Sequence, residues 1–296
     1  MNDDALIARI RALSRPLEPL PTPVQARLPR LPQVRAVLFD IYGTLFISAA
    51  GEIGVGLAVD SDRAFAEALA AVGLPVRGDA ALLTAAIRAE HARKRAAGLD
   101  HPEVDIVAIW QAVLAELGLR APPETVRRLA LEYELRVNPV WPMPALAETL
   151  AWLTARGYRM GLVSNAQFFT PLLFPALVGK SLEELGFSPE LCLFSWQLGV
   201  AKPSTRPFEK ALAALARHEV AAAEVLYVGN DIRNDIRPAA QVGMVGGLYA
   251  GDARSLRLRE DDPGCLGVAP ACVFKTLSQI PEVLGDSCLG IGGTIG

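Results

Sequence analysis

The spacing of apolar residues changes along the chain and divides it into regions of different character. Residues 34–48 contain the short run Val37-Leu38-Phe39, which consists of strand-forming residues and is followed by a polar turn. In residues 49–140 the apolar positions recur at the spacing of amphipathic helices, and in residues 141–284 short apolar runs alternate with helical patterns. Alternating strands and helices predict an α/β fold with a doubly wound parallel sheet, here with a block of helices inserted after the first strand.

Four amphipathic faces account for the inserted region 49–140. They consist of Phe65, Ala68, Leu69 and Val72; Leu82, Leu83, Ala86 and Ile87; Val104, Val107, Trp110, Leu114 and Leu117; and Val126, Leu129 and Tyr133. A stretch with Gly51, Gly54 and Gly56 precedes them, and its spacing is not that of a dinucleotide-binding loop. We interpret it as a hinge.

Four further strands are expected in the region 141–284. Their predicted ranges are Tyr158–Val163, Leu191–Phe194, Val225–Val228 and Gly247–Tyr249. At the N-terminus, residues 3–14 fit a short helix, and a proline-rich strap completes the segment 1–33. The glycine-rich tail 285–296 is expected to be disordered.

Composition and charge exclude several classes of protein. The 296 residues carry a formal net charge of −3, which argues against a nucleic-acid partner. No apolar run is long enough to span a bilayer, and the start of the chain lacks the pattern of a secretory signal, so we expect a cytoplasmic protein without a membrane partner. The four cysteines lack metal-site or paired spacing and are expected to be reduced. The oligomeric state stays open.

Polar residues follow the predicted strands at the edge where ligands of open α/β sheets bind. Asp40 directly follows the first strand, and burying a lone carboxylate there costs several kcal/mol unless a cation pairs with it. Ser164-Asn165 follows the second strand, and Lys202 lies after the third, where we expect it to begin a proline-led helix. Asn230, Asp231 and Asp235 follow the fourth. Each of these signals is weak alone, but together and in this order they indicate one site.

The run Asp40-Ile-Tyr-Gly-Thr and the three later motifs resemble those of the haloacid dehalogenase superfamily of hydrolases. The resemblance implies a Rossmann-like core and a helical cap that closes over the site. It also implies that Asp40 attacks the substrate and becomes a covalent intermediate. Ser164 and Asn165 would contact substrate oxygens, and Lys202 would offset the negative charge around the nucleophile, an electrostatic contribution of the kind that dominates such reactions.

The resemblance further implies a Mg²⁺ site, because oxygen ligands at these positions suit that cation. Its ligands would be Asp40, the main-chain carbonyl of Tyr42 and Asp235, with help from Asn230 or Asp231. The spacing leaves open which of these last two contacts the metal.

Tyr42 departs from the phosphatase pattern, in which a second aspartate stands two residues after the nucleophile. A phenol with a pKa near 10 is a poor proton relay at neutral pH. The sequence Asp-x-Tyr-Gly-Thr resembles that of 2-haloacid dehalogenases, which release halide without a proton and bind no metal. We therefore expect Mg²⁺-dependent hydrolysis of a small phosphorylated substrate first, dehalogenation second, and a catalytically weak binding protein third.

Candidate substrate contacts outside the core motifs are less specific. Thr44 lies in the first motif, and Arg63 is the nearest arginine early in the cap. His91 and Arg95 crowd the end of one cap helix, where a solvent-exposed corner is the simpler interpretation.

Overall fold

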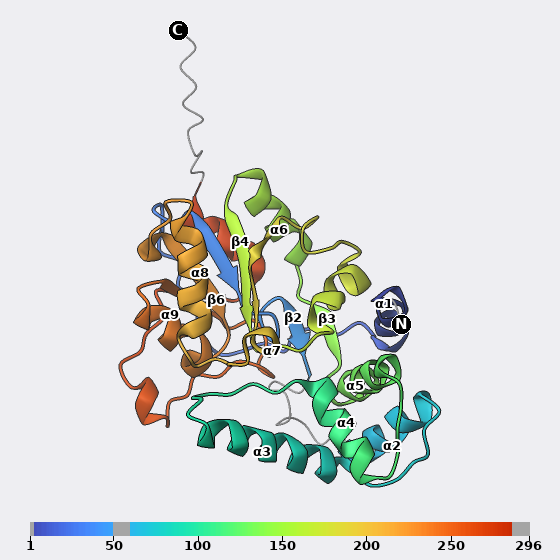
Figure 1. The fold of residues 1–296 in the computed structure, drawn as a ribbon. Coiled ribbons are helices and arrows are strands. Elements are labelled where there is room, and N and C mark those ends of the chain that lie inside the picture. The colour runs from blue at the N-terminus through green and yellow to red at the C-terminus, as the bar shows by residue number, and fades with distance from the viewer. Residues whose placement is uncertain (1–2, 50–59, 286–296) are drawn as a thin grey trace.

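A six-stranded parallel sheet, flanked by helices, forms the core of the computed structural model, which describes residues 3–49 and 60–285 (Figure 1). The strand order is β5-β4-β1-β6-β7-β8, and a separate antiparallel pair is formed by β2 and β3. The strands are β1 (Ala36–Phe39), β2 (Phe46–Ser48), β3 (Val140–Pro142), β4 (Arg159–Ser164), β5 (Phe187–Phe194), β6 (Val225–Gly229), β7 (Val245–Tyr249) and β8 (Cys272–Phe274). The helices are α1 (Asp3–Leu13), α2 (Ser61–Ala71), α3 (Ala80–Ala96), α4 (Ile106–Glu116), α5 (Pro123–Val137), α6 (Leu146–Ala155), α7 (Ser195–Leu198), α8 (Arg206–Ala216), α9 (Arg237–Gln241) and α10 (Ile280–Leu284). The predicted doubly wound α/β fold is confirmed.

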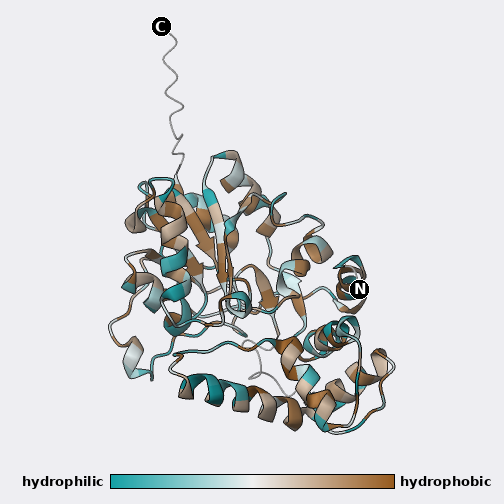
Figure 2. Ribbon diagram, viewed as in Figure 1, coloured by the Kyte–Doolittle hydropathy of each residue, from teal (hydrophilic) through white to brown (hydrophobic). Residues whose placement is uncertain are grey.

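Both faces of the sheet are buried, as the apolar composition of its strands requires. In β1, Ala36 and Leu38 point into a cluster that includes Phe208 of α8. Val37 and Phe39 belong to a larger cluster on the opposite face. Figure 2 shows the central strands in hydrophobic colours between the two helical layers. The sheet is therefore a rigid support for the residues that follow its strands.

Helices α2 to α5 form a cap with a hydrophobic core of its own, centred on Phe65 and Trp110, whose rings stack with centroids 5.2 Å apart. The cap lies beside the carboxyl ends of the sheet strands (Figure 1). The pair β2–β3 lies between cap and core, because β2 follows the first motif and β3 follows α5. The exact domain boundaries stay a prediction.

The N-terminal segment packs against both parts of the molecule. Helix α1 buries Leu6 and Ile10 and lies beside α5 of the cap (Figure 1). It also contacts the π-helical segment Phe174–Val178 of the core. The helix predicted over residues 3–14 ends at Leu13, one residue earlier than expected. Its contacts connect the cap to the core.

Several expectations need correction or lie outside the described residues. Lys202 does not begin a helix, because α8 starts at Arg206. The glycine hinge at 51–56 and the tail after residue 285 lie outside the described ranges. The cysteines in the described part, Cys192, Cys265 and Cys272, are free thiols.

Among the described residues, no helix is both long and apolar enough to cross a bilayer. The cytoplasmic location stays a prediction.

Candidate active site

Asp40 lies at the carboxyl end of β1, and its backbone N–H is held by the carbonyl of Val228 at 2.9 Å. The loop after it turns at Gly43, whose φ of +79° is strained for any other residue. A Cβ at Gly43 would lie 2.5 Å from Cβ of Ser255 and 2.8 Å from the side-chain amide of Asn230. The glycine therefore lets the first motif pack directly on the fourth.

Lys202 joins the nucleophile position to the fourth motif. Its Nζ lies 2.8 Å from Oδ1 of Asp40 and 2.5 Å from Oδ1 of Asp235, and all three side chains are buried. It also donates to the hydroxyl of Tyr227 at 3.0 Å. Burial opposes the charge of the ammonium group, but attraction by Asp235 and Asp40 outweighs it and raises the Lys202 pKa. The lysine is therefore a cation shared by two carboxylates.

Asp235 approaches the end of β6 because residue 229 is a glycine. A Cβ there would lie 2.3 Å from Cγ of Asp235. The second carboxylate oxygen of Asp235 accepts the backbone N–H of Asp231 at 2.9 Å. Burial raises the Asp235 pKa to about 6, with Lys202 lowering it and Asp40 raising it. Asp235 therefore differs from an ordinary surface carboxylate.

The second motif offers a hydroxyl without a partner. Ser164 ends β4, is buried, and its Oγ has no hydrogen-bond partner among the described residues. Asn165 accepts the backbone N–H of Lys202 at 2.7 Å and donates to its carbonyl at 3.1 Å. Asn165 therefore fixes the Lys202 backbone, while the Ser164 hydroxyl remains available to a ligand.

Asn230 and Asp231 are both engaged by protein groups. Asn230 accepts the hydroxyl of Thr44 at 3.1 Å and donates to the carbonyl of Ser255 at 2.6 Å. Asp231 accepts N–H groups at the start of the π-helical segment Ile232–Ile236 and pairs with Arg259 at 2.5 Å. These contacts do not decide whether Asn230 or Asp231 would be the additional metal ligand.

The phenol of Tyr42 is buried and lies 2.9 Å from Oγ1 of Thr170. Burial, together with the charge of Glu134, raises its pKa far above the ordinary value. The hydroxyl therefore stays protonated and cannot act as a base near neutral pH.

The oxygen-rich donor set at this edge fits a hard divalent cation. Asp40 and Asp235, which both pair with Lys202, would supply carboxylates, and Tyr42 would supply a main-chain carbonyl. These are ligands that Mg²⁺ accepts together with water and substrate oxygens. Among the described residues, no three His, Cys, Asp or Glu side chains form a complete metal cluster. A cation here would depend on the carbonyl, water and substrate.

The other candidate contacts are spread over the cap. Arg63 is exposed and pairs with Glu67 one helical turn away at 2.8 Å, so its side chain has a local partner. His91 is partly buried, and burial and the nearby Arg95 lower its pKa. Arg95 is exposed at the end of α3. The structure does not bring these three to the Asp40 cluster through any described hydrogen bond or ion pair.

Sequence reasoning missed several residues around the site. Tyr227 was treated only as part of a strand, yet its hydroxyl also lies 3.1 Å from Asp235 and 2.8 Å from the carbonyl of Val163. Glu134 of α5 accepts the amide of Asn138 at 3.1 Å, and burial raises its pKa to about 7. A polar residue at an inward strand position was the available signal for Tyr227. No signal marked Glu134.

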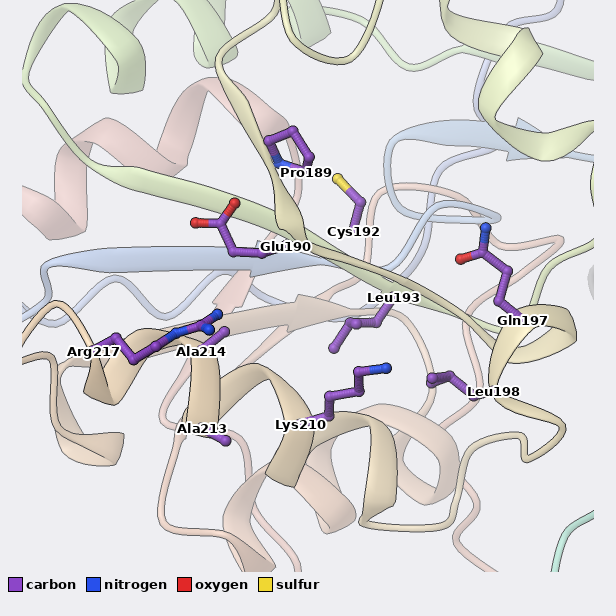
Figure 3. A pocket seen from close by; sticks show the side chains of 10 residues that line it. All are labelled: Pro189, Glu190, Cys192, Leu193, Gln197, Leu198, Lys210, Ala213, Ala214 and Arg217. Carbon is purple, nitrogen blue, oxygen red and sulfur yellow. The ribbon is translucent and has the colours of Figure 1, made fainter.

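Two surface hollows lie apart from Asp40. One, with a volume of about 440 Å³, lies between β5 and α8, where Figure 3 shows Glu190, Cys192 and Lys210 among its lining residues. The other, of about 590 Å³, is lined by Arg233, by 258–262 and by Pro263. Neither hollow is lined by Asp40, Ser164, Lys202 or Asp235, which are all buried.

Comparisons with known proteins identify the family of the chain. Residues 34–243, more than half of the chain, match the family described as haloacid dehalogenase-like hydrolase. The chain therefore belongs to the haloacid dehalogenase-like hydrolases, and it is a hydrolase by family.

Individual proteins with similar sequences or structures include phosphatases and a dehalogenase. A phosphoglycolate phosphatase of Shigella boydii is 30% identical over 273 residues, which cover 85% of this chain and 93% of that protein. A phosphoglycolate phosphatase of Salmonella choleraesuis is 31% identical over 250 residues, covering 77% and 87%. The solved structure of a 2-haloacid dehalogenase from Pseudomonas syringae superimposes with a TM-score of 0.54 at 24% identity and covers 85% of this chain and 98% of that one, which shows a shared fold.

Proposed function

We propose that this hydrolase cleaves a small phosphate monoester through a covalent intermediate on Asp40, with Mg²⁺ as cofactor. The observation that carries the proposal is the cluster in which Lys202 contacts both Asp40 and Asp235 beside the unpartnered hydroxyl of Ser164. A cation and a free hydroxyl donor at the end of a strand suit a phosphoryl group. The phosphoglycolate phosphatases that resemble this chain support the same substrate class.

In the proposed first step, a carboxylate oxygen of Asp40 attacks phosphorus. A bond forms between this oxygen and phosphorus, and the ester bond to the leaving oxygen breaks. The Lys202 ammonium, 2.8 Å from Asp40, offsets negative charge on the transferred group, and the Ser164 hydroxyl donates to one of its oxygens. Water then attacks the phosphorus, which releases inorganic phosphate and restores the Asp40 carboxylate.

Asp40, Asp235 and the Tyr42 carbonyl would hold Mg²⁺, which supplies further charge stabilisation to phosphoryl oxygens when bound. Lys202 and the Tyr227 hydroxyl keep Asp235 in place for this role through contacts of 2.5 and 3.1 Å. The side chains therefore prepare the ligand geometry before substrate arrives.

Protonation of the leaving group is the step that this site supports least. The Tyr42 phenol is buried, bound to Thr170 and held protonated by its raised pKa. General acid–base help contributes typically 10²–10⁴ in rate. The proposed substrates are therefore esters whose leaving oxygen needs little protonation, or the enzyme is slow on simple alkyl phosphates.

Tyr42 also favours a second candidate function, hydrolytic dehalogenation of a small 2-haloacid. In that reaction Asp40 would displace halide from carbon, and halide leaves as a stable anion without a proton. The resulting ester would be cleaved by water at the Asp40 carbonyl. The Lys202 ammonium would then bind the carboxylate of the acid.

A paired screen separates the two functions. Wild type and Asp40→Asn are assayed for phosphate release from a panel of phosphate monoesters and for halide release from 2-haloacids, each with and without Mg²⁺. The proposal predicts Mg²⁺-dependent phosphate release that is lost in Asp40→Asn while the melting temperature is retained. Metal-independent halide release would favour dehalogenation, and phosphate release by Asp40→Asn would overturn the covalent mechanism.

A further inference from the structure

The segment between α3 and α4 connects the cap to the loop that carries Lys202. The backbone N–H of Glu103 donates to the carbonyl of Gly199 at 3.1 Å, and the N–H of Ala201 donates to the carbonyl of His101 at 2.8 Å. Pro102 and Val200 form an isolated antiparallel bridge between these contacts. Ala201 directly precedes Lys202, so a piece of the cap is paired with the backbone next to the catalytic cation.

The Glu103 carboxylate extends this contact to two more core loops. It accepts the hydroxyl of Ser195 at 2.6 Å, and the side-chain amide of Gln167 lies 3.4 Å away. Ser195 Oγ in turn accepts the backbone N–H of Ala166 at 2.9 Å. Ser195 follows β5 and Ala166 follows β4, so one cap carboxylate ties the loops after two neighbouring strands together.

Gln167 continues the network to Tyr42. Its amide donates to the carbonyl of Val104 at 3.0 Å and accepts the N–H of Ile106 at 3.2 Å, which is the start of cap helix α4. Its backbone N–H donates to Oγ1 of Thr170 at 3.1 Å, and that atom lies 2.9 Å from the Tyr42 hydroxyl. A continuous chain of hydrogen bonds therefore runs from the cap to the first motif.

We propose that Glu103 is a positioning residue that latches the docked cap onto the loops carrying Asn165, Lys202 and Tyr42. The latch is the set Glu103, Gln167 and Ser195 with the paired backbone of 101–103 and 199–201. When the latch is formed, docking of the cap also holds the loop that carries Lys202 in place. When it opens, substrate enters and product leaves. Its role in turnover rests on the proposed function, whereas its role in cap docking does not.

Protonation of the Glu103 carboxyl favours the docked state of the cap. Burial raises its pKa, while its bonds with Ser195 and Val104 and the charge of Lys94 on α3 lower it. The core groups that face it, Ser195 and Gln167, are neutral. The docked state therefore binds the Glu103 proton more tightly than an undocked, solvated state. Docking is favoured at low pH and weakens as pH rises above the ordinary carboxyl range through the raised pKa.

Amide hydrogen exchange of the full chain tests the latch without reference to the reaction. The variants are Glu103→Ala, Glu103→Gln and, as a matched control on the same cap, the exposed Glu116→Ala. We expect Glu103→Ala to speed exchange in 101–106 and 199–201 together, on the order of tenfold, while β1 and β6 stay unchanged. Exchange rates are corrected for their intrinsic pH dependence.

Glu103→Gln separates the effect of the titratable charge from the effect of the hydrogen bonds, because it removes only the charge. A glutamine can keep the contacts with Ser195 and Val104 but carries no charge, so the latch should stay protected and lose its pH dependence. Wild-type protection of 199–201 that does not fall with rising pH, or an unaltered pH slope in Glu103→Gln, would overturn the proposal. Unchanged exchange in Glu103→Ala would overturn it as well. If that variant does not fold, the glutamine variant decides alone, and absence of phosphatase activity affects neither readout.

Discussion

Tyr42 is the residue at which this site departs most from a proton-relaying phosphatase. Its hydroxyl is occupied by Thr170, and its raised pKa keeps it neutral. Proton transfer by Tyr42 can therefore be tested separately from nucleophilic attack by Asp40.

Tyr42→Phe should keep turnover within about tenfold of wild type, because a general acid–base residue would contribute 10²–10⁴. The lost hydrogen bond to Thr170 should cost about 1 kcal/mol of unfolding free energy. Steady-state kinetics on aryl and alkyl phosphates measure this, and we expect aryl esters to be the faster substrates in both proteins. A loss of a hundredfold or more in Tyr42→Phe would assign proton transfer to the phenol.

Lys202 is predicted to be essential both to turnover and to the stability of the site. Lys202→Met leaves Asp40 and Asp235 buried without their shared cation, which should abolish turnover and cost roughly 3–5 kcal/mol of unfolding free energy. Because the lysine lowers the Asp235 pKa, its removal raises that pKa further. A raised carboxyl pKa in the folded state lowers stability as pH rises, so the cost should be larger at pH 8 than at pH 5.

The exposed Lys210→Met on α8 is the matched control for this change and should alter stability by less than about 0.5 kcal/mol. Chemical denaturation of both variants at the two pH values provides the comparison. Equal losses at pH 5 and pH 8, or near-normal turnover in Lys202→Met, would contradict the shared-cation account.

At the scale of secondary structure elements, α1 is the element whose role the sequence left most open. Arg9 of α1 makes two contacts, of 2.5 and 2.9 Å, with the carboxylate of Glu132, which is fully buried in cap helix α5 and also pairs with Arg136. Arg11 donates to the carbonyl of Ala176 in the core at 2.9 Å. The helix therefore contacts both the cap and the core.

Arg9→Ala should destabilise the protein by roughly 1.5–3 kcal/mol, because a bidentate charged contact to a buried carboxylate is lost while Arg136 still partly compensates. Thermal unfolding measures the change. Arg15→Ala is the control, since Arg15 is exposed and, within the described part of the chain, its hydrogen bonds go to the carbonyls of Ala12 and Ser14. Equal melting temperatures for the two variants would show that α1 does not hold the cap through Arg9.

The sequence predicted elements with a strong local pattern and missed those decided by tertiary contacts. The strand ranges around Val37 and Val225 followed from continuous apolar runs. The three-residue strands β2, β3 and β8 were not predicted, because such short segments carry too little pattern to identify them.

At the scale of the whole molecule, parallel strand order explains why the sequence could predict the site at all. Residues that follow successive parallel strands meet at one edge of the sheet. The sequence alone could therefore predict one site formed by Asp40, Ser164, Lys202 and Asp235. Gln167 and Glu103 could not be grouped with them. Their roles depend on which loops meet when the cap docks, and sequence spacing does not encode that.

The central claim is that Asp40 becomes phosphorylated during turnover. Rapid acid quench of the wild-type enzyme with a ³²P-labelled phosphate ester and Mg²⁺, followed by peptide mapping, tests it directly. We expect a base-labile acyl phosphate on the peptide containing Asp40, formed fast enough to explain the turnover rate and absent from Asp40→Asn. Turnover of the same ester with no protein-bound label, or with the label on another residue, would contradict it.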